Sequence, residues 1–119
     1  MTRRSRAGAT AAALAGTAPL FAALGDQTRL RLVARLAAEG PLSITRLTDG
    51  ARVTRQAITK HLHALAGAGL VRSSRDGRER IWTIEPRRLV AASRYLDQIS
   101  KQWDDALERL RAFVETDPD

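Results

Sequence analysis

The sequence predicts one mainly α-helical domain with a small β-hairpin and a long C-terminal helix. Apolar residues recur at steps of three and four over most of residues 19–67, which indicates helices. Residues 70–84 instead carry β-branched and aromatic residues on either side of an Asp-Gly turn signal. From Pro86 to about Glu115 the helical spacing returns. With 119 residues, the chain has the length of a single domain with one core.

Composition narrows the classes of function. The chain is 44% hydrophobic and 28% charged, as in soluble globular proteins, and its net charge of +7 suits an anionic partner. Nucleic acid, an anionic membrane and an acidic protein are the candidate classes. The absence of cysteine excludes disulfides, thiolate metal sites and cysteine nucleophiles. No apolar run is long enough to span a membrane, so we expect no membrane partner.

Charge is unevenly distributed along the chain. Residues 52–88 hold nine Lys and Arg against three Asp and Glu, whereas residues 89–119 hold four against seven. The middle of the chain is therefore predicted to bind the anionic partner, and the last segment to have another role. Residues 1–17 are predicted to be a flexible basic arm, which would be a free tail or would contact phosphates non-specifically. Their apolar content is too weak for an export signal, so we expect a cytoplasmic protein.

The domain itself, residues 18–119, is expected to begin with a short helix from about Pro19 to Leu24. Asp26 is a favourable N-cap for a second helix, which Gly40 and Pro41 end. In this helix the spacing predicts a buried stripe of Leu30, Val33, Ala34 and Ala37, widened by Leu32 and Leu36.

A short helix comes next, and a tight turn joins it to the helix that follows. Ser43 caps a helix that runs to about Thr48, Asp49-Gly50 is a turn signal, and Thr54 caps the helix that follows. Together they form a helix-turn-helix. The two-stranded hairpin that comes next, with its turn at Asp76-Gly77, would be a wing beside it. Trp82 lies on a strand of this hairpin, so we expect it to pack in the core.

The helix after Thr54 has two contrasting faces. At 100° per residue, Ile58, Leu62 and Leu65 share the inner face. The outer face carries amide, ammonium, imidazole and hydroxyl groups, which suit base edges and phosphates. The alternative is a solvated basic face, and the basic hairpin that follows argues against it. The predicted DNA-contacting residues of this helix and of the hairpin are Thr54, Arg55, Gln56, Thr59, Lys60, His63, Arg75, Arg78 and Arg80.

Three segments resemble the ArsR-type winged helix-turn-helix regulators over roughly residues 18–115. They are ALGDQTRLRLVARL, TRQAITKHLHALAGAGLV and GRERIW, and the last helix is similar to a metal-free subgroup. The resemblance implies a DNA-binding regulator. It also implies that His61 belongs with the DNA-contacting residues, although the helical spacing puts His61 on the flank. There it would contact a phosphate or pack beneath the outer face.

A metal site is not expected. The segment PLSITRLTDG, which matches the cysteine box of metal-sensing relatives, has no thiol, and residues 86–119 contain no histidine. His61 and His63 are two residues apart and point in different directions on a helix. We therefore expect no metal and no other cofactor.

The last helix has an apolar stripe too long for one small domain to cover. We expect it to pair with a second copy, alongside the first helix, which would place two helix-turn-helix units on successive major-groove faces. The alternative is packing within the monomer only. The predicted dimer contacts are Leu20, Phe21, Leu96, Ile99, Trp103, Leu107 and Leu110.

These features predict a homodimeric, sequence-specific transcriptional regulator that binds operator DNA, more in keeping with a repressor than an activator. An enzyme is not expected, because the chain has no glycine-rich phosphate loop and no plausible Ser/His/Asp set. A non-specific architectural DNA-binding protein and a protein-binding winged helix are the alternatives. A small-molecule effector is left open.

Overall fold

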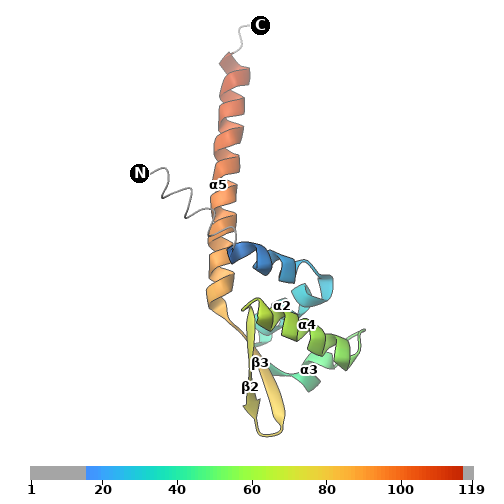
Figure 1. Ribbon diagram of the computed structural model, residues 1–119. Coiled ribbons are helices and arrows are strands. Elements are labelled where there is room, and N and C mark those ends of the chain that lie inside the picture. Colours follow the sequence, from blue (N-terminus) through green and yellow to red (C-terminus); the bar gives the residue numbers. More distant parts are fainter. Residues whose placement is uncertain (1–15, 117–119) are drawn as a thin grey trace.

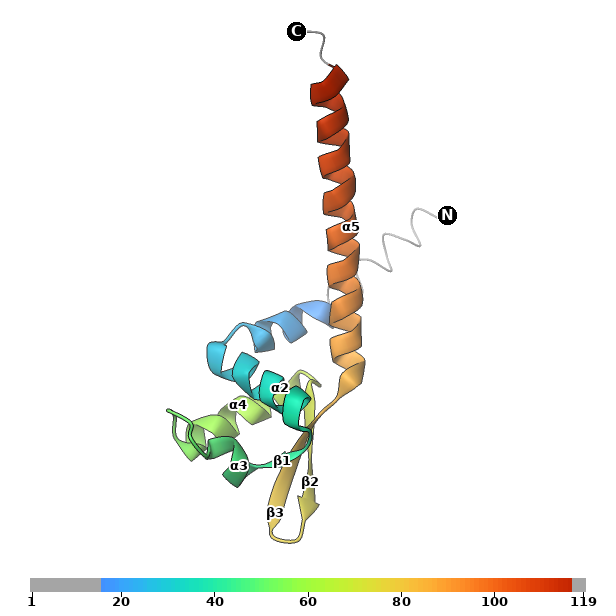
Figure 2. The same ribbon diagram turned by 180° about the vertical axis from the view of Figure 1, so that it is seen from behind.

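The structure, a computed structural model, describes residues 16–116 and confirms the predicted fold class (Figure 1). A small helical body carries an antiparallel sheet, and the last helix projects away from it, as the reverse view also shows (Figure 2). After a helical segment at residues 16–24, the elements are α2 (Gln27–Glu39), β1 (Leu42–Ser43), α3 (Ile44–Thr48), α4 (Arg55–Gly67), β2 (Val71–Asp76), β3 (Glu79–Ile84) and α5 (Pro86–Thr116).

The predicted basic arm, residues 1–17, lies outside the described residues except at its end. Gly16 and Thr17 are helical, and Thr17 is buried. The first helix therefore includes residues ahead of Pro19, where it was expected to begin.

Short side chains cap three of the helices, as the sequence predicted. Asp26 Oδ1 accepts a hydrogen bond from the backbone N–H of Arg29 at 3.0 Å, which caps α2. Ser43 and Thr54 cap α3 and α4 in the same way, at 3.2 and 3.1 Å. Each cap satisfies a backbone donor that the helix leaves unpaired, so these helix starts are encoded locally.

The sheet has three strands in the order β1-β3-β2, one more than the predicted hairpin. β1 was missed because two residues show no periodicity, yet Leu42 pairs with Trp82 of β3. The hairpin turn also shifts by one residue from the prediction. Asp76 still pairs with Glu79, so the turn residues are Gly77 and the one that follows. Gly77 has a φ of 65°, which a two-residue hairpin turn requires.

The core lies where α2, α3 and α4 meet the sheet. Trp82 is 2% exposed, which confirms its predicted packing. The stripe predicted for α2 is confirmed only in part: Leu30 is 50% exposed, whereas Leu32 and Leu36, which were expected to widen the stripe, are the buried residues of this helix. Since α2 has leucines on more than one side, packing against α4 and β3 decides which of them are buried.

Candidate nucleic-acid interface

Helix α4 is anchored by one face and exposes the other. Ile58, Leu62 and Leu65 are at most 2% exposed and belong to the core. This fixes the rotation of the helix about its axis, so the opposite face must point to solvent. The predicted contact residues on that face are all accessible: Thr54, Arg55, Gln56, Lys60 and His63 are exposed and Thr59 is half-buried.

Two hydroxyl groups of this face are partly engaged within the helix. Thr54 Oγ1 caps it, and Thr59 Oγ1 donates to the carbonyl oxygen of Arg55 at 2.9 Å. With its proton so used, the Thr59 hydroxyl offers a bound molecule its lone pairs and its methyl group. Near the N-terminal half of the helix, the side chains of Arg55, Gln56 and Lys60 make no hydrogen bond or ion pair with any residue between 16 and 116.

His61 lies beneath the exposed face, between α4 and the start of α2. Its Nδ1 is 3.2 Å from Nη1 of Arg29 and 3.9 Å from Oδ1 of Asp26. The sequence left two roles open for His61, a phosphate contact and packing beneath the outer face. The contacts with Arg29 and Asp26 show that His61 packs there, and the phosphate contact stays a prediction. The pKa of Asp26 is lowered, mainly by the hydrogen bond from the Arg29 backbone, with smaller contributions from the charges of His61 and Arg29.

The wing presents Arg75, Arg78 and Arg80, all exposed. Arg75 lies directly opposite Arg80 in the β2–β3 ladder, an unfavourable arrangement for two like charges. Arg80 Nη1 donates to Ser73 Oγ at 2.9 Å, which restrains one guanidinium along the hairpin. Ser73 carries no signal in the sequence, because its partner comes from the neighbouring strand.

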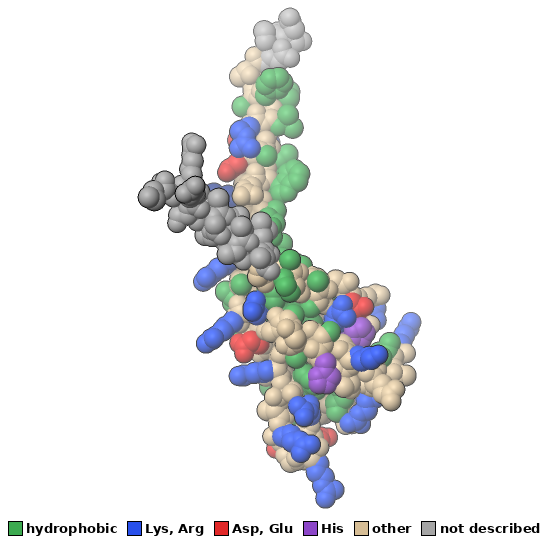
Figure 3. Space-filling model, viewed as in Figure 1, with side chains coloured by type: hydrophobic (Ala, Val, Ile, Leu, Met, Phe, Trp, Pro, Cys, Tyr) green, Lys and Arg blue, Asp and Glu red, His purple; other side chains and the backbone are tan. Residues whose placement is uncertain are grey.

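Helix α4 and the wing form one continuous surface. The ring centroid of His63 is 5.6 Å from that of Trp82, edge to face, so the helix packs directly on β3. Figure 3 shows Lys and Arg side chains over the α3–α4 region and the hairpin, with few acidic ones among them. A cleft of about 260 Å³ joins the two elements, lined by Ile44, Arg55, Thr59, His63, Arg78, Glu79, Arg80 and Trp82.

The predicted dimer residues differ in how exposed they are in the single chain. Leu96, Trp103, Leu107 and Leu110 on α5 are 51–64% exposed, and Ile99 is half-buried. Phe21 is half-buried, with its ring centroid 6.0 Å from that of Tyr95 on α5. Leu20 is only 1% exposed, because its side chain packs in the core of its own protomer. Its inclusion among the dimer contacts was therefore wrong. Phe113 and Val114, near the end of α5, are exposed as well.

Neither a metal cluster nor a membrane-spanning helix is found in the part of the chain that the structure describes. Over residues 16–116, no group of three or more His, Cys, Asp or Glu side chains could hold a metal ion. None of the helices in that range is long and apolar enough to cross a bilayer.

Comparisons with known proteins agree with this geometry. A family model described as a helix-turn-helix domain matches residues 24–74. The HTH-type transcriptional regulator Rv2034 of Mycobacterium tuberculosis is 34% identical over 97 residues, which cover 82% of this chain and 87% of the relative. The solved structure of an ArsR-like transcriptional regulator from Rhodococcus sp. RHA1 has a TM-score of 0.72 and 36% identity, covering 86% of this chain and 95% of the other.

A second solved structure, of an ArsR family transcriptional regulator, has a TM-score of 0.65 and 29% identity and covers 77% of this chain and 91% of the other. The residues matched include the whole of the helix-turn-helix, so fold and sequence lead to the same conclusion. The chain therefore belongs to the ArsR family of helix-turn-helix transcriptional regulators, which are DNA-binding proteins and not enzymes.

Proposed function

We propose that this regulator is a site-specific repressor that binds its operator as a homodimer and senses no metal. The observation that carries the proposal is the continuous surface of α4 and the wing, rich in exposed hydrogen-bond donors. The opposed Arg75 and Arg80 support it, because a repulsive pair on a short hairpin is better explained by an anionic partner than by stability.

Helix α4 and the wing would contact different parts of the DNA. Gln56 and Lys60 on the exposed face of α4 would contact base edges in the major groove, with Arg55 at the N-terminal end of the helix. The wing arginines would contact the phosphate backbone, which positions the protein without selecting a sequence. His63 is held against Trp82 and would contact DNA from the centre of the surface.

The exposed stripe of α5 supports the homodimer. Trp103, Leu107, Leu110 and Phe113 are each more than half exposed on a helix of 31 residues. A water-soluble monomer rarely leaves so much contiguous apolar surface uncovered. A second copy related by two-fold symmetry would cover the stripe and would place two α4 helices on one face of the duplex.

Metal independence is supported by the lack of suitable ligands, and repression by the simplicity of the mechanism that it requires. The chain has no cysteine, and the described residues contain no cluster of ligands. A dimer bound across a promoter would block polymerase without further machinery.

The experiment is selection of genomic fragments by the purified protein, followed by transcription in vitro from the enriched promoters. We expect an inverted repeat whose half-sites are centred about 10 base pairs, or a multiple of that, apart. Transcription should fall as protein is added, equally with and without EDTA. Recovery of fragments with no shared sequence would favour the architectural alternative. Loss of binding in EDTA would contradict metal independence.

A further inference from the structure

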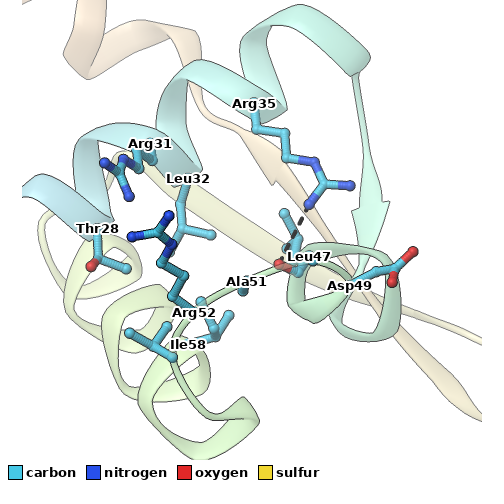
Figure 4. Close-up of a pocket in the computed structure, with 11 residues that line it drawn as sticks. Thr28, Arg31, Leu32, Arg35, Leu47, Asp49, Ala51, Arg52 and Ile58 are labelled. Carbon is cyan, nitrogen blue, oxygen red and sulfur yellow. Dashed lines mark hydrogen bonds between the residues drawn. The ribbon is translucent and has the colours of Figure 1, made fainter.

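A pocket of about 260 Å³ lies between α2 and the segment that joins α3 to α4 (Figure 4). Its deepest walls are Leu32, Leu47 and Ile58, each at most 4% exposed. Val53, which is 38% exposed, adds apolar surface close to the solvent. Apolar walls with polar and charged groups beside them are features of small-molecule sites, although this pocket is smaller than most of them.

Three arginines line the same pocket. Arg35 is already engaged: its Nε donates to Glu39 at 2.7 Å and its Nη1 to the carbonyl oxygen of Leu47 at 3.5 Å. Arg31 and Arg52 have no hydrogen bond or ion pair to any residue between 16 and 116. Figure 4 shows their guanidinium groups directed toward the same space. Two guanidinium groups that line one pocket repel each other, and an anion bound between them would offset that repulsion.

The one acidic residue in the lining is directed elsewhere. Asp49 is exposed, and in Figure 4 its carboxylate points away from Arg31 and Arg52. Neither Gln56 nor Lys60 lines the pocket, whereas Ile58, on the inner face of α4, does. The pocket therefore lies apart from the surface that we assign to DNA bases.

We propose that this pocket binds a small organic anion, with a carboxylate between Arg31 and Arg52 and a short apolar body over Leu32, Leu47 and Ile58. A phosphate of the DNA backbone would satisfy the arginines but would leave the apolar walls without a partner. At the roughly 30 Å³ that a water molecule occupies in the liquid, the volume suits about eight or nine non-hydrogen atoms.

The test is a titration of the isotope-labelled full chain, without DNA, followed by NMR. The probe is hexanoate, and its neutral amide and inorganic phosphate are the controls. We expect saturable binding of hexanoate at roughly millimolar concentration or below, with the largest shifts at residues around the pocket. Hexanamide and phosphate should each bind at least about tenfold more weakly than hexanoate, because the amide lacks the negative charge and phosphate lacks the apolar body.

Variants locate the site. Arg31→Gln and Arg52→Gln should each raise the dissociation constant of hexanoate about tenfold or more, because each removes a charged hydrogen-bond donor. Arg46→Gln is the matched control: it also removes one exposed arginine, outside the pocket, and should change nothing. Absence of saturable binding, equal binding of the amide, or equal affinity in all three variants would overturn the proposal. So would loss of DNA affinity in Arg31→Gln and Arg52→Gln without any hexanoate binding, since those arginines would then contact the DNA backbone.

Discussion

Replacing Trp103 with alanine should separate the two subunits of the proposed dimer. Trp103 is 64% exposed on α5 of the single chain. A large aromatic side chain buries about 150–250 Å², so covering its exposed part removes on the order of 150 Å² from water. At about 25 cal/mol per Å², this is worth about 4 kcal/mol per protomer.

Only part of that energy appears as affinity, because association has its own entropic cost and alanine retains some contact. We take about 2–3 kcal/mol per protomer and count it twice, because two-fold symmetry places both tryptophans at the interface. At 1.4 kcal/mol per factor of ten, the dimer dissociation constant should rise about a thousandfold or more.

Sedimentation of Trp103→Ala beside the wild type, over a range of protein concentrations, measures this change. Lys101→Ala is the control, since Lys101 lies on the same helix but about 200° around its axis from Trp103. DNA affinity should fall with dimerisation in the Trp103 variant although α4 and the wing are intact. A wild type that is already monomeric at micromolar concentration, or a variant that dimerises within about tenfold of it, would refute the assignment of α5 as the dimer element.

Three further predictions concern the DNA surface and the start of α2. The logarithm of DNA affinity should fall with the logarithm of salt concentration, with a slope of about −0.9 per phosphate contacted, because residues 52–88 carry the positive excess; a flat response would contradict DNA binding through that segment. Gln56→Ala should weaken discrimination at one base position by about 1–3 kcal/mol, whereas Arg78→Ala should weaken binding to all sequences alike; binding to a set of single-base operator variants decides between this division and equal effects. Asp26→Ala should lower the melting temperature at pH 7 by removing the cap of α2. Because the folded pKa of Asp26 lies below its ordinary value of 3.8, the contribution of its charge is present above about pH 4 and is lost as the pH falls through the folded pKa. The difference in melting temperature from the wild type should therefore narrow in acid, and a constant difference from pH 7 to pH 2 would show that the charge plays no part.

The local features of the fold could be predicted from the sequence. Asp26, Ser43 and Thr54 cap their helices through a backbone group three residues away, so a short window contains all the information. The exposed face of α4 was predictable for a related reason. Three apolar residues lie on one side of this regular helix. Because that apolar side is buried in the core, the opposite side must point to solvent.

Features that depend on distant partners needed the tertiary structure. Nothing in the spacing of α2 distinguishes Leu30, which is half exposed, from Leu32, which is buried, because several of its faces are apolar enough to pack. β1 forms because β3 supplies its hydrogen bonds. A strand of two residues is too short to show a hydrophobic alternation in the sequence, so it could not be predicted. The dimer assignment of Leu20 failed for the same reason, since the core of the protomer already covers it.

The two candidate binding surfaces differ in the same way. Local sequence was enough to predict which residues of α4 and of the wing are accessible, because a helix of regular pitch and a hairpin with a defined turn present side chains at predictable positions. The pocket of Arg31 and Arg52 joins residues from α2 and from the segment after α3, and their convergence is created by the packing of those elements. Periodicity describes one element at a time, so only the tertiary structure could bring these two guanidinium groups together over an apolar wall.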